Sequence, residues 1–121
     1  MHFRGNRNVW IALASASVTM ILLAGCRSLP PSKPEAQLTP EERAGEQVFS
    51  NYCGRCHYPT TTHGKKGPGL QALTKIKAMP SGAPPTDERI LATIQHGRGM
   101  MQPVDVPDDE LGPLMAYLHT L

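Results

Sequence analysis

The sequence has few aromatic residues, with two Phe, three Tyr and one Trp among 121 positions. A chain of this length forms at most one small domain with accessory segments. No stretch alternates apolar and polar residues with a period of two, so β-strands are not expected. Residues 39–121 should bury too little surface to be stable alone. We therefore expect an all-α domain with something large and apolar at its centre.

Most of the chain has no excess of either positive or negative charge. The formal net charge of +2 comes from Arg4 and Arg7, since residues 27–121 hold equal numbers of basic and acidic side chains. No basic stripe is present that could neutralise a run of phosphates, so a nucleic-acid partner is not expected. Neither a Ser-His-Asp set nor a pair of carboxylates for acid–base chemistry can be placed. Catalysis by side chains and a small-molecule substrate are therefore not indicated.

The N-terminus has the layout of an export signal. Residues 1–8 carry arginine and no acid, and they precede an apolar run over 9–24 that is short for a membrane span. The "LAGC" stretch at 23–26 resembles the lipobox of bacterial lipoproteins. The resemblance implies a signal peptide over residues 1–25 and a lipid on Cys26, which would become the N-terminus. A retained transmembrane segment and an ordinary signal peptide with a free Cys26 are the alternatives.

The lipobox resemblance also implies a location. The protein would be lipid-anchored to a bacterial membrane and face the periplasm. Because Arg27 and not aspartate follows the lipid-bearing cysteine, the outer membrane is favoured over the inner one. Residues 26–38 contain three prolines and little that could pack, so we expect an extended tether. At about 3.1 Å per residue, the twelve residues 27–38 reach at most roughly 37 Å from the membrane.

Two helices are predicted from their start signals. The first covers residues 40–52, where Thr39 can cap the helix and Glu42 completes a capping box. The second covers residues 87–96, where Thr86 can act as the cap and acidic residues fill the first turn.

Two further stretches are less regular. Residues 70–76 can make a turn or two of helix. A last helix should begin near Asp108, but Pro113 would remove a hydrogen bond and clash with the preceding turn. We therefore predict a kink, or a restart of the helix, between Asp109 and Pro113.

The "CGRCH" stretch at 53–57 carries the chemistry. A redox CxxC pair is usually set at a helix N-terminus within a βαβ unit, and a structural zinc site needs two further ligands that the sequence does not supply. A haem attachment site fits, because Cys53 and Cys56 can form thioethers with the two vinyl groups while His57 binds the iron. We expect one covalently bound haem c per chain.

With this motif, residues 39–121 resemble a class I cytochrome c. The resemblance implies an all-α fold of three to four helices around one covalently bound haem c, joined by long loops. In that family a proline carbonyl accepts a hydrogen bond from the iron-bound histidine, and "GPGL" at 67–70 offers Pro68 for this role. Leu70 would pack on the haem.

The resemblance also implies contacts between the first and last helices. Gly45 and Phe49 match the positions where a glycine permits close approach and an aromatic ring packs. Their expected partners are Tyr117 and Leu118.

A methionine sulfur is the expected sixth iron ligand. The "GRGMMQP" stretch at 97–103 occupies the place of the family's ligand loop, and its glycines align Met101 with the ligand. Met100 is the second choice, because Gln102 stands where the family has proline. The remaining candidates are Met79, which precedes a proline but lies before the 87–96 helix, His63 and His96.

The sequence therefore predicts a membrane-anchored, mono-haem electron carrier and not an enzyme. Its partners would be a redox protein that donates electrons and another that accepts them. Two alternatives remain open: a haem subunit of a larger dehydrogenase or oxidase complex, and a sensor or enzyme with an open iron site.

Overall fold

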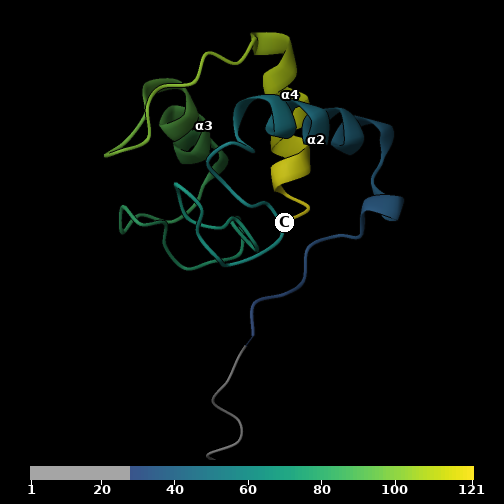
Figure 1. Cartoon of the computed structure of the whole chain (residues 1–121), viewed down its shortest axis with the longest axis horizontal. Coiled ribbons are helices and arrows are strands. Elements are labelled where there is room, and N and C mark those ends of the chain that lie inside the picture. The colour runs from purple at the N-terminus through teal and green to yellow at the C-terminus, as the bar shows by residue number, and fades with distance from the viewer. Residues whose placement is uncertain (1–27) are drawn as a thin grey trace, which may run out of the picture.

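The computed structural model describes residues 28–121, so Cys26 and the predicted signal peptide lie outside the described residues. The described part contains a 3₁₀ turn, η2 (Glu35–Gln37), and three α-helices, α2 (Pro40–Tyr52), α3 (Asp87–His96) and α4 (Asp108–Leu118) (Figure 1). No β-strand lies in this part of the chain, which confirms the all-α prediction. None of these helices has the length and apolar character needed to cross a membrane.

Helix α2 begins as its sequence predicts. The Thr39 hydroxyl accepts a hydrogen bond from the Glu42 amide at 3.2 Å, and the Glu42 carboxylate accepts one from the Thr39 amide at 2.7 Å. These reciprocal bonds satisfy two backbone donors that the first turn would leave free. The helix ends at Tyr52, so the CGRCH stretch directly continues it.

Helix α3 confirms the helix predicted over residues 87–96. The Thr86 hydroxyl accepts from the Arg89 amide at 3.4 Å, and Gly97 ends the helix with a φ of 70°, a conformation that favours glycine. Ile90 and Ile94 form its buried stripe.

Helix α4 corrects the prediction of a restart near Pro113. The helix runs without interruption from Asp108 to Leu118, with Pro113 inside it. Pro113 cannot bond the Asp109 carbonyl, but Asp109 is exposed, so water can take the place of the missing donor. The residues after Pro113 are buried, and their packing keeps the helix continuous.

Residues 70–76 form turns instead of the expected piece of helix. Leu73 and Ile76 donate backbone hydrogen bonds to Leu70 and Ala72 at 3.0 and 3.1 Å. Ala72 has a φ of 57°, which a right-handed helix does not accept. Its side chain is fully buried, so packing holds this conformation.

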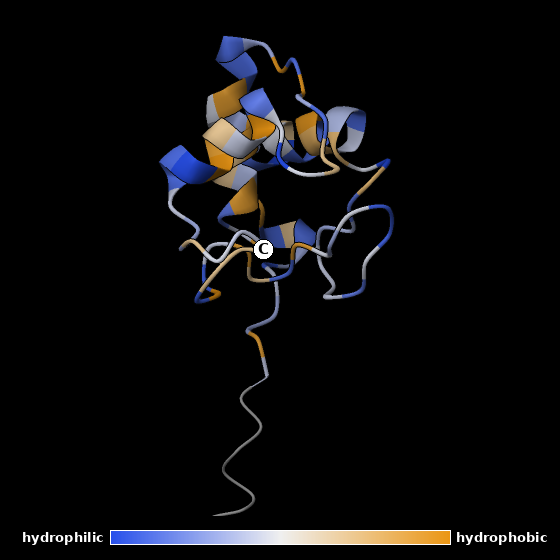
Figure 2. Cartoon of the chain, turned by 90° about the vertical axis from the view of Figure 1, so that its left-hand side faces the viewer, coloured by the Kyte–Doolittle hydropathy of each residue, from blue (hydrophilic) through white to orange (hydrophobic). Residues whose placement is uncertain are grey.

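The core lies where the helices meet, and Figure 2 shows apolar residues gathered there. Helices α2 and α4 cross closely: a Cβ added at Gly45 would overlap the Pro113 carbonyl and lie 2.8 Å from the Tyr117 Cβ. Phe49 and Tyr117 pack with ring centroids 5.6 Å apart. This confirms the close approach expected at Gly45. The buried core cluster comprises Leu38, Val48, Phe49, Ile90, Ile94, Val106, Leu114, Met115, Tyr117, Leu118 and Leu121.

The proline-rich segment is docked on the domain, contrary to the expectation that it packs against little. We call residues 30–38 the strap. The Lys33 amide donates to the Thr120 carbonyl at 2.7 Å, and the Lys33 ammonium lies 2.6 Å from the Glu42 carboxylate. Leu38 is only 7% exposed and belongs to the core. The strap is thus bonded to other parts of the domain and is not the free tether that the sequence predicted. The boundary between tether and domain at residue 38 stays a prediction.

Gly45→Ala should destabilise the protein by about 1–3 kcal/mol, because the added methyl group forces α2 and α4 apart. The measurement is denaturant unfolding of the haem-loaded protein. Gly112→Ala is the matched control, since nothing lies within 4 Å of a Cβ added there in α4. That control should be stabilised by up to about 1 kcal/mol. Equal stabilities of the two variants would contradict the close crossing.

Stability should fall at high pH because of Tyr117. Burial, followed by the charges of Glu46 and Glu35, raises the pKa of Tyr117 to about 12. Unfolded tyrosine has a pKa of about 10, so between these values the unfolded state releases a proton that the folded state keeps. The free energy of unfolding should therefore drop by about 2–3 kcal/mol as pH rises from about 10 to 12. Unfolding titrations of Tyr117→Phe should lack this component of the decline.

Candidate functional site

The CGRCH stretch forms a tight turn at the end of α2. The Cys53 and Gly54 amides both donate to the Phe49 carbonyl, at 2.8 and 2.9 Å. The Cys56 and His57 amides both donate to the Cys53 carbonyl at 3.0 Å. These bonds fix the two cysteines and the histidine on one short piece of backbone whose position is set by α2.

The two thiols are free and half-buried. Burial, with a smaller contribution from Cys56, raises the pKa of the Cys53 thiol to about 11. Reactive redox pairs depend instead on a thiol whose pKa is lowered, so Cys53 lacks the property that such a pair needs. Within residues 28–121 no three His, Cys, Asp or Glu side chains are grouped so as to hold a metal ion.

His57 is oriented by the loop that follows it. Its Nδ1 lies 2.8 Å from the Pro68 carbonyl oxygen, which is the contact expected from the sequence. A carbonyl only accepts hydrogen bonds, so Nδ1 carries the proton and Nε2 keeps a free lone pair. This is the tautomer that binds iron through Nε2.

Gly67 supports the ring from one side, a feature that the sequence reasoning missed. A Cβ at Gly67 would overlap the imidazole and lie 2.9 Å from its Nδ1. The Gly67 amide also donates to the Cys56 carbonyl at 2.8 Å. The glycine-rich "GKKGPG" stretch was the available signal, but it does not show which glycine approaches the ring.

The loop between His57 and Leu70 is closed by further contacts. The Leu70 amide donates to the Tyr58 carbonyl at 2.9 Å. The Lys65 ammonium donates to the Gly54 carbonyl at 2.9 Å and lies 5.2 Å from the centroid of the Tyr58 ring. The backbone that holds the Pro68 carbonyl is thereby tied to the CGRCH turn at several points.

The methionine-bearing stretch forms a second tight turn. Arg98 and Met101 exchange two backbone hydrogen bonds, at 2.9 and 3.0 Å, and Gly99 adopts a φ of 57° between them. Met100 stands at the tip and is 90% exposed, whereas Met101 is half-buried against the core. The turn therefore directs Met101 inward and Met100 outward, which favours Met101 as the ligand; its bond to iron stays a prediction.

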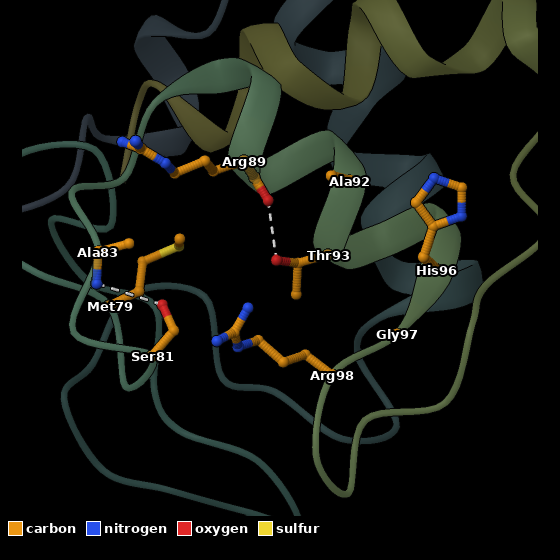
Figure 3. A pocket seen from close by; sticks show the side chains of 9 residues that line it. All are labelled: Met79, Ser81, Ala83, Arg89, Ala92, Thr93, His96, Gly97 and Arg98. Carbon is orange, nitrogen blue, oxygen red and sulfur yellow. Dashed lines mark hydrogen bonds between the residues drawn. The ribbon is translucent and has the colours of Figure 1, made fainter.

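The other candidates for the sixth iron ligand lie outside this turn. His63 and His96 are exposed, and Met115 is buried in the core through α4. Met79 borders a cavity of about 320 Å³ between α3 and the 79–83 turn (Figure 3). The cavity is lined by Met79, Ser81, Ala83, Arg89, Ala92, Thr93, His96, Gly97 and Arg98.

The residues present fit a haem. Two thiols and an imidazole with a free Nε2 lie on one turn, and a thioether sulfur is directed inward by the other turn. Half-buried apolar side chains beside the core would be covered by a flat apolar macrocycle. They include Leu70, Leu73, Met79, Leu91, Met101, Val104 and Leu111. The predicted contact of Leu70 with the haem is consistent with its place in this set and stays a prediction.

A three-helix fold in which the first helix leads directly into CxxCH, with an oriented histidine, defines a c-type cytochrome. This confirms the class I cytochrome c-like fold predicted from the sequence.

The chain belongs to the family described as cytochrome C oxidase, cbb3-type, subunit III, which it matches over residues 40–118. The match begins with α2 and ends with α4, so it includes both turns of the site. No individual curated protein matches the chain.

Replacing Met101 should change the iron coordination, and replacing Met100 should not. The oxidised wild-type protein should show the weak near-infrared absorption of a methionine–iron bond. Met101→Ala should lose this band and Met100→Ala should keep it, because only Met101 is directed toward the core. Loss of the band in Met100→Ala alone would reverse the assignment.

Proposed function

We propose that this protein is a membrane-anchored, mono-haem electron carrier. The haem c would be bound covalently, one per chain, by Cys53 and Cys56. When bound, it supplies a one-electron redox centre. Cys53 and Cys56 would hold the haem, and the His57 Nε2 and the Met101 sulfur would bind its iron.

The observation that carries the proposal is that both residues proposed as iron ligands are held in place by hydrogen bonds. The His57 ring is held by the Pro68 carbonyl at 2.8 Å, and Met101 is held by paired backbone bonds to Arg98. With both residues bound, the iron would have no open position, and such a centre would reorganise little when its charge changes. The family also suggests an electron-transfer role.

The surface around the CGRCH turn supports a protein partner of opposite charge. Arg55, Lys65 and Lys66 are exposed beside the two cysteines. A basic rim attracts an acidic redox partner and raises its association rate at low ionic strength. We propose that the donor or the acceptor contacts this rim.

The anchor and its location belong to the same proposal. Lipid on Cys26 would hold the domain at a bacterial membrane on the periplasmic side, with the outer membrane favoured. Two or three acyl chains give stable attachment, whereas a single chain binds reversibly.

A haem subunit of an oxidase complex is the second candidate, because the family description names an oxidase subunit. The chemistry of the site is the same in both cases. Mild solubilisation of native membranes separates them: an independent carrier migrates alone, and a subunit migrates with other polypeptides.

Carbon monoxide distinguishes a carrier from an enzyme or sensor with an open iron site. The reduced wild-type protein should bind little carbon monoxide at neutral pH and should titrate as a single one-electron wave. Met101→Ala should bind it readily, because one axial position becomes free. Strong binding by the wild-type protein would overturn the electron-carrier proposal.

A further inference from the structure

The strap joins parts of the domain that lie far apart in sequence. The Pro30 carbonyl accepts from the Gln71 side chain at 3.0 Å, and the Lys33 amide donates to the Thr120 carbonyl at 2.7 Å. The chain that leads to Cys26 therefore leaves the domain beside the 71–77 turn and the C-terminal end of α4. Figures 1 and 2 both show it leaving there, away from the start of α4.

The ion pair between Lys33 and Glu42 strengthens this docking. Both Glu42 carboxylate oxygens accept from the Lys33 ammonium, at 2.6 and 2.9 Å, and hydrogen bonding to Lys33 holds the pKa of Glu42 below its usual range. The Glu42 carboxylate is therefore charged at neutral pH. Because Leu38 is buried in the core, the strap is fixed at both of its ends.

We propose that the strap fixes which face of the domain lies against the lipid surface. The inference rests on the proposed lipid anchor at Cys26. With the strap docked, only residues 27–29 separate Cys26 from Pro30, a reach of about 14 Å and not the roughly 37 Å of a free tether. So short a connection holds the face around Gln71 and Lys75 next to the bilayer.

The composition of the two ends of the domain agrees with this orientation. Leu29, at the point of exit, is an exposed apolar residue, and the exposed Lys75 reaches the Leu121 carbonyl at 3.3 Å. The opposite end begins α4 with Asp108, Asp109 and Glu110. Helix α4 has 11 residues and is about 16 Å long, so these acids are held away from an anionic lipid surface.

The test uses the mature, haem-loaded, lipidated protein in vesicles of phosphatidylethanolamine and phosphatidylglycerol. Its native cysteines are consumed by thioethers and lipid, so an introduced cysteine alone reacts with a maleimide fluorophore. Lys75→Cys and Asp109→Cys place the fluorophore at the two ends. Energy transfer to acceptor-labelled lipid, normalised to vesicles without acceptor, should be larger for Lys75→Cys.

Releasing the strap should reduce this difference. Lys33→Pro removes both the amide that bonds Thr120 and the ammonium that pairs with Glu42. The matched control is Ser28→Pro, a proline introduced at an exposed position just before the strap. In the Lys33→Pro background energy transfer should become similar for the two labels, whereas in the Ser28→Pro background it should keep the wild-type difference.

A second measurement, amide hydrogen exchange, tests whether the strap is docked when no membrane is present. In the haem-loaded Cys26→Ser protein, the Lys33 amide should exchange slowly with deuterium. Lys33→Pro should speed exchange of the Gln37 and Leu38 amides by about tenfold or more, with an unchanged visible spectrum showing that the domain is folded. Rapid exchange of the Lys33 amide in the Cys26→Ser protein would overturn the docked strap.

The outcomes separate the orientation from the anchor. Equal energy transfer from the two ends in vesicle-bound wild-type protein would overturn the orientation and leave the anchor standing. No incorporation of labelled fatty acid, and no vesicle binding that depends on Cys26, would overturn the anchor and the orientation with it.

Discussion

The close crossing of α2 and α4 is the contact on which the rest of the structure depends. Gly45 lets the backbone of α2 lie against the Pro113 carbonyl of α4, and the Phe49 and Tyr117 rings pack beside it. One end of α2 then fixes Glu42, which holds the strap. The other end leads into the CGRCH turn. The CGRCH turn and the docked strap are thus both positioned by the same pair of helices.

The two residues predicted to bind the iron are restrained by different means. His57 is restrained by its side chain, through the Pro68 carbonyl and the adjacent Gly67 backbone. Met101 is restrained by its backbone, through the paired bonds with Arg98. A glycine lies beside each of the two residues: Gly67 against the His57 ring, and Gly99, with a positive φ, just before Met101. The loops between the helices therefore orient both residues, through contacts that are local to each loop.

The features that the sequence predicted are those with local causes. The Thr39 capping box and the Thr86 cap lie within one helical turn of the residues that they serve, and the CxxCH spacing is itself the chemical signal. A restart of α4 at Pro113 and a piece of helix over residues 70–76 were wrongly predicted, because burial of the surrounding residues overrides a local preference. The strap was missed because its bonds join residues such as Lys33 and Thr120, which no sequence pattern connects. The lipid on Cys26 and the iron bond of Met101 stay predictions, because each depends on chemistry beyond the folded chain.

The pairing of α2 with α4 also determines when the domain can fold during synthesis of the chain. A chain is synthesised from its N-terminus, so α2 and the CGRCH stretch emerge well before residues 108–118. Until α4 emerges, α2 lacks the partner that buries Phe49, and the Lys33 amide lacks its acceptor on Thr120. The two cysteines therefore become available for haem attachment while the chain is still loosely packed. Helix α4 then packs on α2 and buries Phe49.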